Sequence, residues 1–269
     1  MAGRRFFWSE AKIERYLKNG KGQGRGKEYK PWITVESGFS TGNQYKVFGL
    51  KTERIHHFLS SLEYHYFLLL EWNDSVIDIR ERFPLLNRVE AMAIAKERYM
   101  NYPHCSETRT PLIITTDFLV DTIVDGKIKQ FARSILPEKK KNIRRNVERY
   151  SLEQEYWARR NIAFAVVSEK QLNFSIVRNY LSFRTAYILE ATKALSAEEL
   201  QQLLPSLRRY LLLSPKDVEV RSVCGDFDKF NSLPKGTAWY LFRHMLARKE
   251  ITVDMNQKNY ESCRIEHFK

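Results

Sequence analysis

The chain has 269 residues, which is long enough for a sizeable buried core and for two domains of ordinary size. Hydrophobic residues make up 43% and aromatic residues 13% of the sequence, which excludes a natively disordered chain because such chains lack the apolar groups that form a core. The net charge of +13 is larger than solubility requires, so we expect a polyanionic partner, with nucleic acid favoured over membrane.

The sequence contains no segment typical of a membrane or secreted protein. No apolar run approaches the roughly 20 residues that a bilayer-spanning helix needs, and residues 1–10 lack the apolar stretch of a signal peptide. The three cysteines are far apart and form no C-x-x-C pair, which argues against a disulfide framework and against a zinc site. We therefore expect a soluble, cytoplasmic protein with reduced thiols.

The first predicted element is a short helix over residues 9–18, for which Ser9 is a suitable N-cap. A basic, glycine-rich stretch follows over residues 20–27, but it lacks the spacing and the Ser or Thr of a phosphate-binding P-loop. Two interpretations remain open. The stretch is either a flexible loop that brings Arg25 and Lys27 close to a DNA backbone, or a plain mobile linker.

Residues 60–72 are predicted to form a helix whose core-facing positions are Leu62, Tyr66, Leu69 and Leu70. Glu63 shares a stripe with Phe67 and Leu70, so its carboxylate is expected to point toward the apolar side, where a charge requires a cationic partner. Ser60 and Glu63 also fit a capping box, and this segment in isolation favours that interpretation. The two histidines at residues 56–57 are expected in a surface loop.

The middle of the chain predicts strands. Residues 76–83 alternate apolar and charged side chains before Pro84, as a half-buried strand does. A β-branched run over residues 113–124 then meets Asp125-Gly126, a dipeptide typical of tight hairpin turns. A second hairpin strand is expected over residues 127–136.

The predicted hairpin brings Asp117, Ser134 and Leu136 to one face of its two strands. With a two-residue loop, Val124 faces Lys127 and Asp117 lies across from Ser134, with Leu136 diagonal on the same face. One acid on the first strand and acid-x-Lys on the second is the pattern with which PD-(D/E)xK nucleases hold Mg²⁺. Here the second strand reads Ser134-Ile135-Leu136, so the lysine of that pattern is missing.

A basic segment follows the hairpin, within a helix predicted over residues 137–160. It contains Lys139, Lys140, Lys141, Arg144, Arg145 and Arg149. These residues either contact DNA phosphates, which their position beside Asp117 favours, or form the solvated face of the helix. A continuous apolar run over residues 162–167 predicts a strand buried on both faces and completes a βαβ step. We place the boundary of the first domain here, at residues 1–168.

The second predicted domain, residues 169–269, is mainly helical. Helices are expected over residues 175–189, 197–213 and 234–249, the second of them opened by a Ser196–Glu199 capping box and kinked or divided at Pro205. A hairpin of residues 251–254 and 260–267 is expected after them. Helices followed by such a hairpin indicate a winged-helix-like domain for partner or DNA binding.

A series of motifs occurs in order along the first half of the chain: Gly22-Gln23-Gly24, Lys27-x-Tyr29-x-Pro31-Trp32-Ile33-Thr34-Val35, His56-His57-x-Leu59-Ser60, Leu62-Glu63, Leu70-Glu71-Trp72, Asp78-Ile79-Arg80-Glu81, Phe83-Pro84-Leu85 and Thr116-Asp117-Phe118-Leu119-Val120. Together they resemble the TnsA family, the endonuclease subunits of heteromeric cut-and-paste transposons. The resemblance is dense from about residue 9 to residue 137 and thin beyond.

The resemblance implies an α/β, restriction-endonuclease-like fold of the PD-(D/E)xK type, a mixed sheet flanked by helices, with a smaller helical, winged-helix-like C-terminal domain. It also implies Mg²⁺-dependent cutting of double-stranded DNA, with Mn²⁺ as an alternative metal. The family nicks the 5′ ends of the transposon, while the transposase TnsB cuts and joins the 3′ ends. The ATPase TnsC binds the C-terminal region.

For the site, the resemblance matches Glu63 and Asp117 to the acidic pair that holds the metal, and Ser134 to a polar residue of the strand. The main-chain carbonyl of Ile135 matches a further metal ligand, and Leu136 stands at the position of the catalytic lysine. Two hypotheses follow: an endonuclease subunit whose activity Leu136 impairs, or a nuclease-inactive subunit that binds DNA and assembles with TnsB and TnsC. A lysine of residues 139–141 reaching back into the centre is a further open account.

Overall fold

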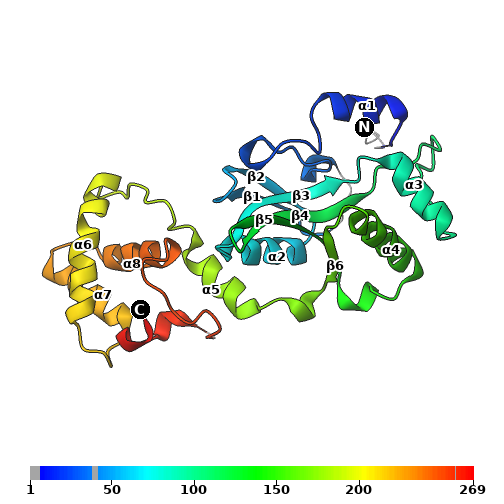
Figure 1. The fold of residues 1–269 in the computed structure, drawn as a ribbon. Helices are drawn as coiled ribbons and strands as arrows, with labels where there is room; N and C mark the ends of the chain where they lie inside the picture. Colours follow the sequence, from blue (N-terminus) through cyan, green and yellow to red (C-terminus); the bar gives the residue numbers. More distant parts are fainter. Residues whose placement is uncertain (1–6, 38–41, 258) are drawn as a thin grey trace. The chain divides into compact units, whose positions relative to one another are not determined.

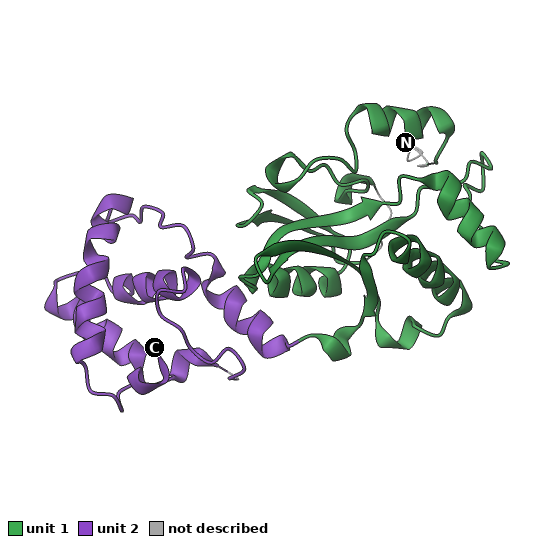
Figure 2. Cartoon of the chain, in the orientation of Figure 1, with its two compact units in different colours: residues 1–172 green, residues 173–269 purple. Residues whose placement is uncertain are grey.

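The computed structural model describes residues 7–37, 42–257 and 259–269. Residues 1–6, part of the opening segment considered above, lie outside the described residues. The chain forms two compact units, residues 1–172 and residues 173–269 (Figure 2). The boundary proposed from the sequence, after Ser168, lies in the same connection. Among the described helices, none combines the length and the apolar character needed to cross a bilayer.

The first unit is built on a four-stranded mixed sheet in the order β3-β4-β5-β6. Its strands are β3 (Val76–Pro84), β4 (Thr115–Val124), β5 (Lys127–Ile135) and β6 (Ala163–Val167). β3, β4 and β5 pair antiparallel, and β5 pairs parallel with β6. The hairpin register is as predicted, with Val124 opposite Lys127, and Asp125 and Gly126 turn the chain with positive φ angles of 52° and 71°. A mixed sheet flanked by helices confirms the predicted fold class (Figure 1).

Helices lie on both faces of this sheet. Neighbouring residues of β4 point to opposite faces, so the two sets of side chains pack on different elements. Phe118 packs toward α2 (Ser61–Trp72), where it contacts Tyr66, and toward the separate two-stranded sheet of β1 (Tyr45–Gly49) and β2 (Arg54–Phe58). Leu119 packs on the other side in a core that includes Trp157 of α4 (Arg144–Ala158), near α3 (Arg88–Glu97). The first helix, α1 (Glu10–Lys18), begins after Ser9, whose side chain caps it as predicted.

Several predictions for this unit are wrong in an instructive way. β6 is an edge strand with Ala163 and Ala165 exposed, so its apolar run does not reflect burial on both faces. β3 does not present a solvated charged face, since Asp78, Arg80, Glu81 and Arg82 are all buried. The helix predicted from residue 137 starts at Arg144 instead, and a 3₁₀ turn, Glu138–Lys140, precedes it. In α2 the buried stripe includes Glu63, Phe67 and Leu70, while Leu62, Tyr66 and Leu69 are only half-buried.

The second unit consists of α5 (Phe174–Arg184), α6 (Ala197–Leu213), α7 (Val220–Phe230) and α8 (Thr237–Ala247). The Ser196–Glu199 capping box is confirmed, and Pro205 lies inside α6 without dividing it. The helix predicted over residues 175–189 ends early, at Arg184, and the one over residues 234–249 is shorter at both ends. α7 was not predicted.

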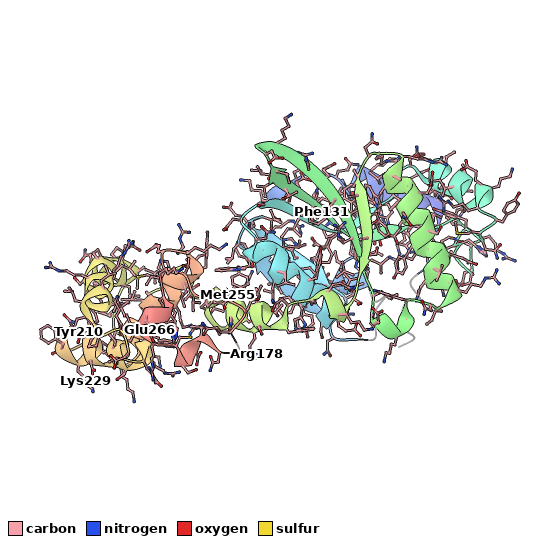
Figure 3. The ribbon with its side chains drawn as sticks, turned by 60° about the horizontal axis from the view of Figure 1, so that its bottom comes forward. Phe131, Arg178, Tyr210, Lys229, Met255 and Glu266 are labelled. Atoms are coloured by element: carbon pink, nitrogen blue, oxygen red, sulfur yellow. The ribbon has the colours of Figure 1, made fainter. Side chains whose placement is uncertain are left out.

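The predicted hairpin of the second unit is not a pair of strands in the described residues. Isolated bridges join Val253 to Phe268 and Glu219 to Arg264. The segment from residue 253 to residue 268 contains the 3₁₀ turns Tyr260–Ser262 and Ile265–His267. Lys258, in the predicted turn, lies outside the described residues. The segment is instead held by side chains: Asn179 of α5 donates to the Met255 carbonyl at 3.1 Å. Met255 is labelled in Figure 3. A wing in the strict sense is therefore replaced by a loop packed on helices.

Candidate active site

Glu63 lies in the first turn of α2, and its contacts agree with both interpretations offered by the sequence, the helix cap and the carboxylate on the apolar side. The Ser60 hydroxyl accepts from the Glu63 amide at 3.2 Å and donates to Oε1 of Glu63 at 2.9 Å. Oε2 of Glu63 accepts from the amide of Leu59 at 3.0 Å, rather than from that of Ser60 as in a regular capping box. The carboxylate therefore closes its own helix end, and the same Oε2 also faces the apolar side of α2.

Asp117 lies where β4 and β5 separate. Regular pairing of these strands ends at Phe118 and Arg133, and Oδ2 of Asp117 accepts from the amide of Ile135 at 2.7 Å. The carboxylate thus occupies the fork between the strands. Since the N–H and C=O groups of one strand residue point to the same side, the Ile135 carbonyl faces this fork as well.

Arg82 brings the two carboxylates together. Its Nη2 lies 2.6 Å from Oε2 of Glu63, and its Nη1 lies 2.6 Å from Oδ1 of Asp117. All three residues are buried, with exposed fractions of 7% for Glu63, 9% for Arg82 and 4% for Asp117. The convergence expected for residues 63 and 117 is present, and an arginine that the sequence did not single out stands at its centre.

Arg82 keeps its positive charge although it is buried. Burial alone lowers the pKa of this guanidinium, but the carboxylates of Glu63 and Asp117 outweigh that effect and raise the pKa. A buried cation between two buried acids also explains how Glu63 tolerates the apolar side of α2, as the sequence required.

A second buried group adjoins the first from α4. Glu153 accepts from Nε of Arg149 at 2.9 Å, from the Ser134 hydroxyl at 2.6 Å and from the Thr116 hydroxyl at 2.9 Å. Burial raises the pKa of Glu153, against the opposing influence of Arg149. Ser134, which was expected to be the polar residue of the catalytic strand, hydrogen-bonds this glutamate.

Arg149 connects the two groups. Its Nη2 donates to the Thr115 carbonyl at 2.9 Å and lies 3.8 Å from Oδ1 of Asp117. Arg149 and Glu153 are four residues apart on α4, the spacing at which helical side chains meet. That spacing was visible in the sequence, but nothing there distinguished this pair from the exposed Arg144–Glu148 pair one turn earlier. Arg82 gave no such signal, because the alternation of β3 indicated an exposed charge.

Leu136 is half-buried, and its amide donates to the Val167 carbonyl of β6 at 2.9 Å. The lysines that follow it differ from one another. Lys139 and Lys140 are exposed on the 3₁₀ turn, whereas Nζ of Lys141 lies 2.8 Å from Oε2 of Glu138. No contact of these three residues with Glu63 or Asp117 occurs among the described residues.

A cavity of about 650 Å³ lies beside Arg149 in the first unit. Its lining combines apolar residues with polar and basic ones: Met100, Asn101, Tyr102, Pro103, His104, Leu112, Ile113, Ile114, Thr115, Arg145, Asn146, Glu148, Arg149 and Leu152. Arg145, predicted to bind DNA, therefore borders a hollow that leads toward the Arg149–Asp117 contact. Arg144, predicted for the same role, is exposed but paired with Glu148 at 2.8 Å.

The glycine-rich loop is packed rather than freely flexible. Gly22 has a φ of 76°, and a Cβ placed there would lie 2.2 Å from Cγ of Pro84 on β3. The amide of Gly26 donates to Oδ1 of Asp78 at 3.2 Å. Lys27 is exposed, and Nη1 of Arg25 lies 3.5 Å from Oδ2 of Asp121.

Among the described residues, no cluster of three or more His, Cys, Asp and Glu side chains is arranged to hold a metal. The oxygens at the fork are two carboxylates, Glu63 and Asp117, and the carbonyl of Ile135. These hard oxygen atoms are of the type that Mg²⁺ prefers. In this arrangement, however, Oε2 of Glu63 and Oδ1 of Asp117 are both engaged by Arg82.

Comparison with known proteins shows the family of the chain. The family described as TnsA-like endonuclease N terminal matches residues 73–169, and the family described as TnsA endonuclease C terminal matches residues 171–255. The chain is 37% identical over 221 residues to the Transposon Tn7 transposition protein TnsA of Escherichia coli, a match that covers 82% of this chain and 77% of that protein. The buried carboxylate pair in a mixed sheet, the order of the motifs and these similarities lead to one conclusion: the chain belongs to the TnsA endonuclease family.

Proposed function

We propose that this chain is the DNA-cutting subunit that nicks the 5′ ends of a cut-and-paste transposon, acting with a TnsB transposase and a TnsC ATPase. The observation that carries the proposal is the convergence of Glu63 and Asp117 at the fork of β4 and β5, on a shared guanidinium. Two buried acids at a sheet edge are costly unless they bind cations, which is what a metal-dependent nuclease requires.

The metal of this proposal is Mg²⁺, with Mn²⁺ as an alternative. Glu63, Asp117 and the Ile135 carbonyl would hold it. When bound, such an ion lowers the pKa of a coordinated water and neutralises charge on the phosphate. Because Arg82 now engages an oxygen of each acid, its guanidinium must leave at least one of them for a metal to bind.

The residues of the chain support binding of the DNA backbone around this centre. Lys27, Lys139, Lys140 and Arg145 are exposed, and Arg145 lines the cavity that reaches Arg149. Exposed lysines and arginines bind phosphates chiefly by charge, independently of sequence. Lys141 and Arg144 are already paired with glutamates, so we assign them a smaller share. The helical second unit is the part proposed to bind TnsC.

The test is a nicking assay on double-stranded transposon-end DNA with TnsB, TnsC and Mg²⁺. We expect 5′-end nicks with this chain and their loss with Asp117→Asn, which keeps the size of the side chain and removes its charge. Nicks that persist undiminished in Asp117→Asn would contradict the proposal. Chelation of Mg²⁺ should abolish cutting, and Mn²⁺ should restore it.

A second candidate function is favoured by Leu136, which stands at the lysine position of the motif. In this alternative the chain binds DNA and assembles with TnsB and TnsC but does not cut. The nicking assay separates the two functions, since an assembly subunit leaves the 5′ ends intact while still forming the protein–DNA complex. If only Leu136→Lys cuts, the present sequence is a silenced nuclease. If neither protein cuts while Glu63→Ala leaves assembly intact, the assembly function is the correct one.

A further inference from the structure

Arg82 is held in a backbone conformation that is unusual for its residue type. Its φ is 50°, in the left-handed region that non-glycine residues seldom adopt. The β3–β4 ladder is interrupted there, between the pairs Glu81–Phe118 and Phe83–Thr116. Residues in such conformations cost of order 1–3 kcal/mol and tend to occur at functional sites. At Arg82 the turn of the backbone aims the guanidinium at Glu63 and Asp117.

The hydrogen-bonding capacity of Arg82 is only partly used. Nη1 and Nη2 contact the two acids, but the buried Nε has no hydrogen-bond partner among the described residues. A buried donor without an acceptor is costly, and at Arg82 it leaves one N–H beside the two acids able to take a further acceptor. The planar guanidinium fits phosphate oxygens particularly well, because it presents several N–H groups in a fixed fork.

Other cations of the first unit are less suited to this role. Arg149 donates to Glu153 and to the Thr115 carbonyl, and its approach to Asp117 is longer, at 3.8 Å. Lys141 is paired with Glu138, and Lys139 and Lys140 are exposed on a turn beyond the end of β5. Position 136, where the nuclease motif carries its lysine, is a half-buried leucine. Arg82 is the cation that contacts both acids.

We propose that Arg82 supplies the positive charge that the nuclease motif carries at position 136, by donating to the phosphate that is cut. This inference rests on the proposed nuclease function. In the hydrolysis, a water oxygen forms a bond to phosphorus while the bond from phosphorus to the leaving sugar oxygen breaks. One water proton ends on that sugar oxygen, and the new phosphate monoester keeps the water oxygen.

Arg82 takes no proton in this step, because a guanidinium does not deprotonate in proteins. Its role is electrostatic: Nε, together with any Nη released from the carboxylates, donates to the phosphate oxygens as negative charge accumulates on them. The site therefore exchanges ion pairs within the protein for ion pairs with DNA. A lysine at position 136 and an arginine at position 82 become interchangeable sources of the same charge.

The experiment compares this chain with Arg82→Gln, Arg82→Lys, Leu136→Lys and the double variant Arg82→Gln/Leu136→Lys. The 5′-nicking rate is measured under single-turnover conditions with TnsB, TnsC and saturating transposon-end DNA, and DNA affinity is measured separately. We expect Arg82→Gln to slow nicking by about two to three orders of magnitude with little change in affinity. Arg82→Lys should recover part of the rate, and adding Leu136→Lys to Arg82→Gln should recover most of it.

Arg80→Gln is the matched control. Arg80 is a buried arginine of the same strand, paired with Asp121 and Asp78, and its Nε also lacks a hydrogen bond among the described residues. Its replacement tests the loss of a buried arginine without touching Glu63 or Asp117. We expect Arg80→Gln to lower thermal stability and to keep the nicking rate of folded protein, as judged by circular dichroism.

A second measurement does not depend on cutting. In metal-free buffer Arg82→Gln leaves Glu63 and Asp117 without their cation, so its unfolding temperature should fall below that of the natural chain. Mg²⁺ or Mn²⁺ should raise that temperature more in Arg82→Gln than in the natural chain, since the acids are then available. An equal response of both proteins to the metals would overturn the exchange on which the inference depends.

The outcomes separate the inference from the proposed function. If Arg82→Gln nicks as fast as the natural chain, the inference is wrong and the nuclease function stands. If this chain is silent and Arg82→Gln gains activity, Arg82 blocks the site. If this chain is silent and only Leu136→Lys gains activity, Arg82 does not supply the missing charge. In both cases the inference and the proposed cutting by this chain are wrong. If no variant cuts, including the double variant, the proposed function fails first and the inference falls with it.

Discussion

Two adjacent residues of β3, Glu81 and Arg82, belong to buried charge networks of opposite character. Glu81 accepts from Nη1 of Arg54 at 2.8 Å, from Nδ1 of His56 at 2.8 Å and from the His57 amide at 3.2 Å. The far side of His56 is closed by the Thr52 hydroxyl at 2.7 Å. Both carboxylate oxygens of Glu81 thus have partners in the buried interior.

The Arg82 network, by contrast, is incomplete. It keeps an unpaired donor, a left-handed backbone and an excess of ionisable groups at the fork of β4 and β5. The difference teaches that burial of charge alone does not indicate function, because a saturated network fixes β2 against β3 and has no capacity for a ligand. Unmet hydrogen-bonding capacity together with strain distinguishes the site.

The comparison is tested most severely by Glu81→Gln. This change leaves Arg54 with a weakened partner in a site where Glu81 is 1% exposed, and we expect a loss of about 3–5 kcal/mol in the free energy of unfolding. Urea denaturation followed by circular dichroism measures it. A loss below about 1 kcal/mol would mean that the network around Glu81 is not the saturated, stabilising one described.

Glu63→Gln should behave in the opposite way. The glutamine carbonyl can still accept from the Leu59 amide, and its NH2 group can donate to the Ser60 hydroxyl in place of the bond that the hydroxyl now donates. Arg82 keeps Asp117, so we expect a loss of only about 1–3 kcal/mol. Nicking should nevertheless fall by about two orders of magnitude or more, because a charged oxygen is lost from the fork.

Glu63→Ala is the companion variant, since it also removes the helix-end contacts and should cost about 1 kcal/mol more. If Glu63→Gln cuts normally while Glu63→Ala only destabilises, Glu63 is a capping residue alone, and the contrast with Glu81 disappears.

The pH dependence of stability should differ in sign between Glu81 and Glu153. Burial opposes ionisation of Glu81, but His56 and Arg54 outweigh it and hold the pKa of this carboxyl well below its usual range. Its contribution is therefore present above pH ~4.3 and is lost as pH falls through the depressed pKa. Burial raises the pKa of Glu153, so its contribution is present below pH ~4.3 and declines as pH rises through the raised pKa.

Urea denaturation between about pH 3 and pH 8 checks both signs. The stability difference between the natural chain and Glu81→Gln should narrow toward low pH. The free energy of unfolding of the natural chain, relative to that of Glu153→Gln, should instead be highest at low pH. Parallel curves for the two variants would contradict the opposite environments of these glutamates.

The smallest expected effect concerns the basic turn before α4. Lys139→Ala and Lys140→Ala should each weaken DNA binding and reduce the slope of log affinity against log salt by about 1. Lys141→Ala, whose ammonium is paired with Glu138, is the matched control and should change the slope less. Fluorescence anisotropy over a range of salt concentrations measures this. Equal slopes in all three variants would return these lysines to the solvated-face interpretation.

Much of the first unit was predictable because its signals are local. The Asp125-Gly126 turn fixed the hairpin register, so the position of Asp117 at the β4–β5 edge was correctly expected. Ser60 marked the start of α2, and the stripe of Glu63 with Phe67 and Leu70 required a cation near Glu63. The predicted hairpin of the second unit was wrong in extent, because among the described residues its segments pair at an isolated bridge between Val253 and Phe268 and are otherwise held through side chains such as Asn179.

The sequence by itself determined the family, the mixed sheet and the pair of acids, since turn chemistry, capping and periodicity act over a few residues. Only the tertiary structure decided which cation meets those acids. The alternation of residues 76–83 placed Arg82 on the charged face of a half-buried strand, whereas it is buried, and the left-handed turn at Arg82 follows from packing rather than from residue type. The partner of a buried charge is set by strands and helices distant in sequence, which no local pattern records.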